Sequence, residues 1–477
     1  GEFVNKEETR LVCKLQVFDL EEVISKAKHA TTPERQLQCL LLTRLAGYSQ
    51  VAGDYQLLRY CIYLAMRLVL DGGAGEHTIT IFGMYSILRA KHKYYLEADK
   101  FSKAAVQLVE FYPQSPDLSL FYNGIGAMQW FYTSPFSQAC DFLHKSHDLC
   151  LLNGEILGGL IGGLTNSVIN LFVMGQRLET LSERLVRVHS LLHKHQQKIA
   201  AGGYYSYLVM ALMKPSSSNI NLPNPLGESV FPPDEWQLIQ SCVMKSFIEH
   251  LQLQWFFWSE QNELAWMSVK AAEPSLELMS GFITPLEHRF IAALLACQKY
   301  PDASEKEQLE LVGYIECSMD ELETLTKLCP ENFEHKLHLL RAEQSRVLSH
   351  DMSLVLARYE QAIQSTKAGG YLQYQALANE LCARYWITQG FDTAARRYLQ
   401  QAIYVYQQWG CLLKCSLLQQ QYDGLLVNKT MSSETRQLET SYSEATTSGD
   451  GGSLSSSENQ PKLNVESVMA ATQQISS

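Results

Sequence analysis

Apolar residues along most of the chain recur every three or four positions, the spacing that places them on one face of a helix. The pattern is clearest around Gly390, where two such segments meet at a short turn. Small or branched side chains lie five, nine and twelve residues after this glycine, at Ala395, Leu399 and Ala402. Small side chains at these positions let antiparallel helices approach closely. The pattern therefore predicts a helical hairpin over residues 371–410.

The same spacing recurs after turns predicted at Gly53 and Ser134, and again after a proline-rich segment in the middle of the chain. A further hairpin is predicted with its turn near His92, followed by Phe101 and Ala104. One hairpin cannot bury its own apolar face, so the recurrence predicts a stack of neighbours. Successive short alternating runs joined by Asn-Gly or Asp-Gly turns, which would predict a sheet, are absent from the sequence. We therefore expect an all-α fold, a tetratricopeptide-like α-solenoid of antiparallel helical hairpins.

Changes in composition divide the chain into parts. A stretch with five prolines interrupts the helical pattern, and a Ser, Thr and Gly-rich stretch near the end predicts a disordered linker. The predicted parts are an N-terminal segment with a tripeptide typical of a cloning scar (1–17), the first half of the solenoid (18–213), an irregular crossing segment (214–235), the second half (236–426), the disordered linker (427–462) and the start of an amphipathic helix (463–477).

Composition narrows the class of protein. The net charge is -11, and the sequence has no long basic run, which argues against a nucleic-acid partner. The twelve cysteines form no CxxC pair, follow no secretory signal and fall mostly in apolar helical patterns. This distribution is typical of buried, reduced thiols. We expect a cytoplasmic protein.

An uncharged stretch from Ile156 to Gly175 raises the alternative of a membrane span, since its glycines form small-xxx-small pairs. Against this, polar residues such as Asn166 and Asn170 interrupt the stretch, and no aromatic or basic belt frames it. Gly175 also falls at a predicted repeat turn. A buried solenoid helix is the favoured interpretation, and we expect no membrane span.

Two pairs of residues have the spacing of a metal or reactive site. His189 and His193 lie four residues apart on a predicted helix, but the intervening residues lack the Glu of a zinc-protease motif and no third ligand can be named. Cys411 and Cys415 have the same spacing, and packing of a capping helix explains them equally well. No nucleophile–base arrangement can be assembled. We predict no catalytic, cofactor-binding or metal site in this chain.

Since no catalytic site is predicted, we expect the chain to bind another molecule. In a solenoid of hairpins the first helix of each pair lines the concave groove, and the groove positions can be projected from the turns. Mixed aromatic, Met and charged residues suit a peptide or a partner domain. The alternative is that several of these residues belong to the core. The projected groove residues are Phe82, Arg89, Met128, Tyr132, Gln254, Trp258, Glu380 and Arg384.

Four stretches resemble one family: CPENFEHKLHLLRAE (329–343), ALANELCARYW (376–386), ARRYLQQAIYVYQQWG (395–410) and the terminal LNVESVMAATQQIS. They are similar to the helical-repeat region of large signalling hybrids, in which a Ser/Thr-kinase-like domain and an AAA-type ATPase domain precede tetratricopeptide-like repeats. A GAF domain and a histidine kinase of a two-component system follow. The resemblance implies that the terminal stretch is the signalling helix that enters the GAF domain. Ser349-His350-Asp351 departs from the family, which has a Gly-containing turn there.

These observations favour a non-catalytic regulatory and protein-interaction module of a multidomain signalling kinase or ATPase. Its partners would be a protein, a peptide or the neighbouring kinase, ATPase and GAF domains implied by the resemblance. The first alternative is a free-standing adaptor that holds a peptide or small inducer in its groove. A weaker alternative is a helical hydrolase or transferase that uses the His189 and His193 region.

Overall fold

The computed structural model describes residues 2–15, 20–25, 32–153, 165–194, 201–216, 242–349 and 351–426. These residues belong to one compact unit that extends to Leu426. Helices dominate them, and no β-strand forms among them apart from a single isolated bridge between Ser280 and Phe282. The all-α prediction is confirmed. The predicted linker (427–462) and terminal helix (463–477) lie outside the described residues, as does most of the proline-rich segment.

The helices from α3 to that segment form the N-terminal array, and α1 and α2 precede it. Their bounds are α1 Glu2–Leu15, α2 Leu20–Ser25, α3 Pro33–Ala52, α4 Tyr55–Gly72, α5 Thr78–Lys91, α6 Tyr95–Val109, α7 Leu118–Met128, η1 Trp130–Tyr132, α8 Phe136–Asn153, α10 Thr165–Val173, α11 Leu178–Lys194 and α12 Ala201–Leu212.

The helices after that segment form the C-terminal array. Their bounds are α14 Cys242–Trp258, α15 Asn262–Ala272, η3 Glu273–Met279, α16 Thr284–Lys299, η4 Tyr300–Asp302, α17 Glu305–Leu328, α18 Pro330–Leu348, α19 Met352–Gly369, α20 Leu372–Thr388, α21 Asp392–Trp409, α22 Leu412–Gln421 and α23 Asp423–Leu426.

Sequential hairpins build both arrays, as the spacing of small residues predicted. The closest helix pairs are consecutive in the chain, including α20 with α21, α18 with α19 and α5 with α6. Gly390 has the left-handed conformation of a helix-ending turn, with φ of 79°. Ala395, Leu399 and Ala402 after it are all fully buried. The three positions at the same spacing after Ser134 are fully buried as well.

The second hairpin differs from the prediction by one residue. The turn was predicted near His92, with the buried positions counted from that residue, and the left-handed residue is Lys93, with φ of 64°. Ala98, Ser102 and Ala105, which lie five, nine and twelve residues after Lys93, are therefore the fully buried small positions. The sequence misled because left-handed backbone favours glycine, and lysine gives no such signal.

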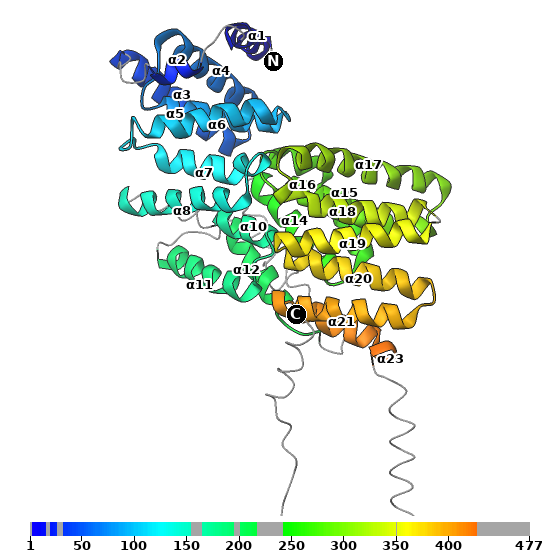
Figure 1. Cartoon of the computed structure of the whole chain (residues 1–477). Coiled ribbons are helices and arrows are strands. Elements are labelled where there is room, and N and C mark those ends of the chain that lie inside the picture. The colour runs from blue at the N-terminus through cyan, green and yellow to red at the C-terminus, as the bar shows by residue number, and fades with distance from the viewer. Residues whose placement is uncertain are drawn as a thin grey trace, which may run out of the picture. The chain divides into compact units, whose positions relative to one another are not determined.

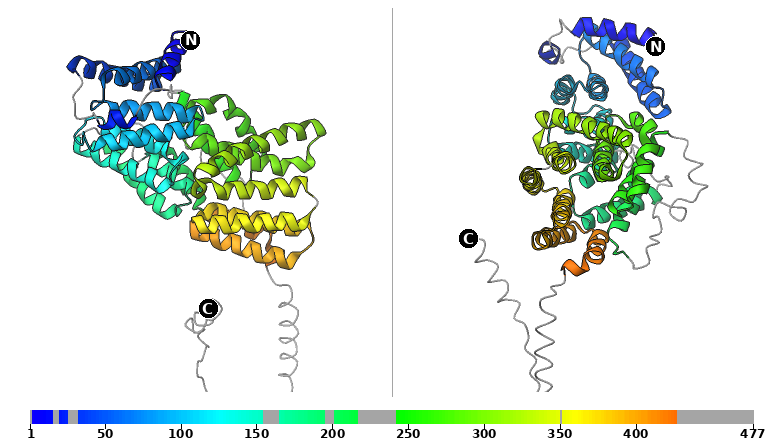
Figure 2. Two further views of the ribbon diagram at one scale, coloured as in Figure 1. Left: turned by 45° about the horizontal axis from the view of Figure 1, so that its top comes forward. Right: turned by 90° about the vertical axis from the view of Figure 1, so that its right-hand side faces the viewer.

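The two arrays lie side by side, with the α3–α12 stack next to the α14–α21 stack (Figure 1; Figure 2). Two side-chain amides connect the arrays, and we call the contacts of Asn332 the upper clasp and those of Gln373 the lower clasp. Asn332 at the start of α18 donates to the carbonyls of Phe131 and Ser134, and Gln373 at the start of α20 donates to the carbonyls of Phe172 and Val173. Asn332 and Gln373 are 41 residues apart, as are Phe131 and Phe172. The two stacks therefore advance together, one repeat at a time.

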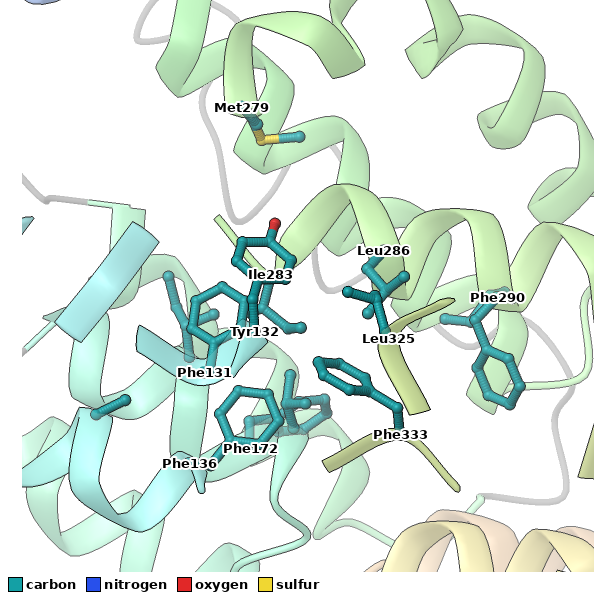
Figure 3. Close-up of a cluster of buried hydrophobic side chains, with 14 of the residues drawn as sticks. Phe131, Tyr132, Phe136, Phe172, Met279, Ile283, Leu286, Phe290, Leu325 and Phe333 are labelled. Atoms are coloured by element: carbon teal, nitrogen blue, oxygen red, sulfur yellow. The ribbon is translucent and has the colours of Figure 1, made fainter. Parts of the chain in front are cut away.

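Between the clasps the seam is apolar (Figure 3). Phe131 stacks on Phe136 with ring centroids 5.3 Å apart, and Phe136 meets Phe333 of the other array at 6.3 Å. Lower in the seam, Phe172 meets Trp409 at 5.9 Å. All five rings are nearly or completely buried. We call this set the aromatic seam.

Candidate interaction sites

The eight projected groove residues do not line an open groove. Seven are less than 9% exposed, and the side chain of Arg384 is 28% exposed. Their burial corrects the expected exposure and has a structural cause. In the C-terminal array, α14 packs against later helices, as the contacts of Trp258 with Tyr374 and of His250 with His288 show, and this packing buries Gln254 and Trp258.

In the N-terminal array the projected residues also make internal contacts. The Phe82 ring meets Phe101 edge-on at 5.3 Å, and Arg89 donates to Glu97 at 2.8 Å. Two others face the C-terminal array: a side chain added at Gly281 would meet Met128, and Tyr132 donates to the carbonyl of Phe282 at 3.5 Å. These residues therefore help to form the seam.

The projected residues of the C-terminal array meet in one interior. Gln254 accepts a hydrogen bond from the Trp258 indole at 3.0 Å, and Trp258 packs against Trp409 at 5.1 Å. Glu380 and Arg384 form an ion pair at 2.7 Å one helical turn apart on α20. These residues are therefore held by contacts within the array.

Glu380 and Arg384 belong to a set of four charges, of which Glu380 and Lys414 are buried and the other two are partly buried. The other members are Glu260, in the turn between α14 and α15, and Lys414 on α22. The Lys414 amino group lies 2.7 Å from a Glu260 oxygen and 2.8 Å from Glu380, and Arg384 lies 2.9 Å from Glu260. Tyr406 adds a hydrogen bond to Glu380 at 2.7 Å. We call Glu260, Glu380, Arg384 and Lys414 the charge cluster.

The charge cluster is balanced, with two carboxylates and two cations. Burial alone would raise the pKa of Glu260, but Lys414 and Arg384 outweigh it and lower that pKa to about 2. Burial alone would lower the pKa of Lys414, but Glu260 and Glu380 raise it. Each charged state is therefore stabilised by the others, and the cluster ties the first hairpin of the array to its last helices.

Glu260 reaches the cluster from a left-handed backbone, with φ of 61°. This conformation costs a non-glycine residue about 1–2 kcal/mol. Gly53 and Gly390 occupy the equivalent place in other hairpins, with φ of 77° and 79°. Nothing in the sequence singles out Glu260, because an acidic residue in a polar turn is typical of a surface position.

A second buried polar group centres on Glu287 of α16. Lys336 lies 3.1 Å from one carboxylate oxygen, and the Tyr374 hydroxyl donates to the other. The Lys336 amino group also lies 3.2 Å from Nε2 of His335, whose ring stacks on Tyr371 at 3.6 Å. Nothing in the sequence singles out His335, because its burial depends on α20 from a later repeat.

The remaining candidates have structural surroundings. Cys411 and Cys415 are buried, and burial raises the pKa of the Cys411 thiol to about 12 and of the Cys415 thiol to about 11. His189 and His193 lie on α11, with side chains outside the described set. Within the described ranges no three His, Cys, Asp or Glu residues are grouped as a metal site.

Residues 156–164 of the uncharged stretch lie outside the described set, and 165–173 form α10. Of the helices described, none is both long and apolar enough to cross a membrane. Asn170 on α10 donates to the carbonyl of Gly126, and Gly175 has φ of 76° at the turn that was predicted.

No family model matches the chain. No curated protein matches it in sequence either. Among solved structures, one similar chain is a circular tandem repeat protein with novel repeat topology and enhanced subunit contact surfaces. It is 10% identical, the match covers 86% of this chain and 99% of that chain, and the TM-score is 0.17. A score this low carries no argument, so the assignment to the α-solenoids rests on the helix packing itself.

Proposed function

We propose that the chain is a non-catalytic regulatory and protein-interaction module of a cytoplasmic signalling protein. The main support is an apolar stripe on α3, at the outer end of the N-terminal array. Leu37, Leu41, Leu45 and Tyr48 recur at helical spacing and are 56%, 60%, 43% and 71% exposed. Exposed apolar patches of this kind are typical of protein contacts.

The stripe fits the apolar face of a partner helix. Helices inside a repeat array are covered by neighbours on both sides, and a terminal helix normally has a polar outer face. α3 packs mainly against α4, and its outer face keeps the apolar pattern of an internal helix. A helix that continued the stack would bury these four side chains. By the family resemblance, a neighbouring ATPase or kinase domain would supply that helix.

Such a module acts by changing the populations of different arrangements of its neighbouring domains. A partner that binds one arrangement of the neighbouring domains better than another shifts the equilibrium by the difference between its two binding free energies. The clasped arrays give the module a defined geometry through which this difference is transmitted.

The test has two steps. Sequencing outwards from the coding region should reveal kinase or ATPase domains in frame upstream and a GAF domain downstream. Their absence would contradict the proposed parent protein. In the parent, the double variant Leu41→Glu/Leu45→Glu should change regulated kinase activity at least fivefold, whereas Leu309→Glu, at a 77% exposed leucine on α17, should not. Equal behaviour of the two variants would contradict the role of α3.

A free-standing adaptor for a peptide or small inducer is the second candidate. It is favoured by a cavity of about 500 Å³ that residues of both arrays line, including Phe136 and Asn332. An adaptor would bind its ligand with the same affinity whether or not further domains are attached, which distinguishes it from the first proposal.

A further inference from the structure

One side of α4 has the composition of a protein interface. Tyr55, Arg59, Tyr63 and Arg67 recur every four residues, the spacing that keeps side chains on one side of a helix. The Arg59 guanidinium lies 5.9 Å from the centre of the Tyr55 ring and 5.8 Å from that of the Tyr63 ring. Tyr and Arg are enriched among the residues that dominate binding between proteins. We call these four residues the α4 face.

The α4 face differs from the packing surfaces inside the arrays. Helices of the hairpins meet through small side chains, whereas the α4 face has two rings and two guanidinium groups. Other buried residues of α4, such as Leu58, Ile62 and Ala65, are apolar, as expected inside a repeat array. α4 therefore has one side suited to recognition next to sides suited to packing.

The helix α1 occupies the α4 face (Figure 1). A carboxylate oxygen of Glu8 lies 2.6 Å from the Arg59 guanidinium, and a carboxylate oxygen of Glu7 lies 2.6 Å from that of Arg67. One turn to either side of the two glutamates, Val4 and Leu11 are 5% and 1% exposed. The buried side of α1 thus has two adjacent glutamates between two apolar residues.

Without α1, the α4 face would be strongly basic. Arg89 at the end of α5 adds a third guanidinium, 4.0 Å from Glu8, and Lys91 adds an amino group 5.2 Å from the centre of the Tyr55 ring. Among the ion pairs of the described residues, Glu97, at 2.7 Å from Arg89, is the one carboxylate outside α1 that pairs with these cations. Four cations would then face one carboxylate, in a chain whose net charge is -11. A helix that carries carboxylates is the complementary partner.

The attachment of α1 is suited to exchange. The side chains of Arg59, Arg67 and Glu8 are 16%, 25% and 29% exposed, so water and salt reach their ion pairs, and such pairs stabilise a contact only weakly. In its described part α1 buries three residues, whereas α5, which also has 14 residues, buries eleven. Elements with few buried contacts open at a low cost in free energy.

We infer that the α4 face is a docking site for an acidic amphipathic helix of a partner protein, and that α1 occupies the site when the partner is absent. The partner helix would carry two adjacent glutamates, one for Arg59 and one for Arg67. Apolar residues three positions before and three positions after the glutamates would take the places of Val4 and Leu11. This site goes beyond the proposed function, because it lies on α4 instead of α3 and requires no kinase or ATPase domain.

The experiment measures binding of a fluorescent peptide to the full chain by fluorescence anisotropy. The peptide has the sequence of residues 4–15 with Cys13→Ser. α1 competes with the peptide because it is part of the same chain as the site. The variant Glu7→Lys/Glu8→Lys repels α1 from the two arginines and leaves every residue of the α4 face intact. It should bind the peptide at least tenfold more tightly than the wild-type chain does.

A matched variant controls for net charge. Glu305→Lys/Glu316→Lys changes two exposed glutamates of α17 and makes the same change in net charge. It should bind the peptide with the affinity of the wild-type chain. Equal affinity in the wild type and both variants, or equal strengthening in the two variants, would overturn the inference.

Charge reversal locates the site. Arg59→Glu/Arg67→Glu should bind a peptide in which both glutamates are replaced by lysine at least tenfold more tightly than the wild-type chain does. Lys103→Glu/Arg177→Glu, at side chains that are 55% and 58% exposed, makes the same change in net charge and should bind this peptide no better than the wild type. Equal binding of the lysine peptide to the two variants would contradict a site at Arg59 and Arg67.

Sedimentation velocity distinguishes a foreign partner from a second copy of the chain. The acidic peptide should leave the sedimentation of the wild-type chain unchanged, because α1 docks within its own chain. A dimer that the peptide dissociates would mean that a second copy supplies the helix, and this result would contradict the inference.

Discussion

The charge cluster and the aromatic seam both join segments far apart in the chain, but they do so with different forces. In the charge cluster, Lys414 pairs with Glu260 across 154 residues inside one array. In the aromatic seam, Phe136 meets Phe333 of the other array through ring contacts alone. Ion pairs depend on every partner and on pH, whereas apolar contacts depend on shape and buried area. The first junction therefore fails when one group is lost, and the second weakens gradually.

The largest expected effect comes from removing one charge. Lys414→Met leaves the carboxylates of Glu260 and Glu380 with Arg384 as the only cation of the cluster, and breaking a buried ion pair in this way costs about 3–5 kcal/mol. Urea unfolding should show a loss of about 4 kcal/mol, whereas Lys367→Met, on the exposed end of α19, should stay within about 0.5 kcal/mol.

A variant that restores the charge balance tests whether the four groups of the charge cluster act together. The double variant Lys414→Met/Glu380→Gln leaves Glu260 and Arg384 as a balanced pair, so it should be more stable than Lys414→Met alone. Strict additivity of the two single losses would show that the four groups do not act together.

Next in size is the upper clasp. Asn332 is 1% exposed, donates to two carbonyls at 2.7 and 2.8 Å and accepts from the Phe136 amide at 3.1 Å. Asn332→Leu would leave these three buried backbone groups without partners, at a cost of about 3 kcal/mol or more. The exposed Gln361→Leu on α19 is the control, and an equally small loss in both variants would mean that the clasp contributes nothing.

A pair of glycines separates backbone strain from contact between the arrays. Gly53 and Gly175 have nearly the same φ, 77° and 76°. A side chain added at Gly53 meets nothing within 4 Å, whereas one added at Gly175 comes within 2.8 Å of the Leu372 amide nitrogen in the other array. Gly53→Ala should cost about 1 kcal/mol through φ alone. Gly175→Ala should cost about 1–2 kcal/mol more, and equal losses would contradict a close seam at this point.

As the pH is lowered, the buried histidines should reduce the stability of the fold before the charge cluster does. Burial lowers the pKa of His288 to about 4 and that of His250 well below the usual value. Unfolded histidine takes up a proton near pH 6.5, so stability should fall from about pH 6.5 down to about pH 4. The pKa of Glu260 is lowered to about 2, so its contribution is complete above about pH 4.5 and is lost below that value.

His288→Leu checks this order. Each proton taken up on unfolding changes the stability by about 1.4 kcal/mol per pH unit. The variant should therefore have a flatter stability profile between pH 4 and 6.5 and an unchanged profile below pH 4. An unaltered slope in the upper range would show that His288 is not buried in its neutral form.

The sequence predicted local features better than distant ones. The turn at Gly390 and the buried positions of Ala395, Leu399 and Ala402 follow from spacing within one hairpin, and the structure confirms them. The turn at Lys93 was displaced by one residue because no glycine marks it. Packing of α14 inside its own array, which buries Trp258, depends on residues more than a hundred positions away and left no periodic signal.

The clasps show the same limit. Asn332 and Gln373 are polar residues at helix starts, where such residues are common for local reasons. Only the pairing of the two arrays reveals that their amides reach carbonyls of another stack. The fold class was therefore predictable from spacing, whereas the interior of the projected groove and the cavity beside His335 required the three-dimensional structure.

Hydrogen exchange tests the central claim most directly, namely that two helical arrays are clasped into one unit. Amide exchange at residues 171–176 and 371–375, which form the lower clasp, should be measured in the full chain and in Asn332→Leu. If the clasps act together, loss of the upper one should speed exchange at the lower one at least tenfold. Unchanged protection there, with faster exchange only around Phe131 to Phe136, would contradict the account.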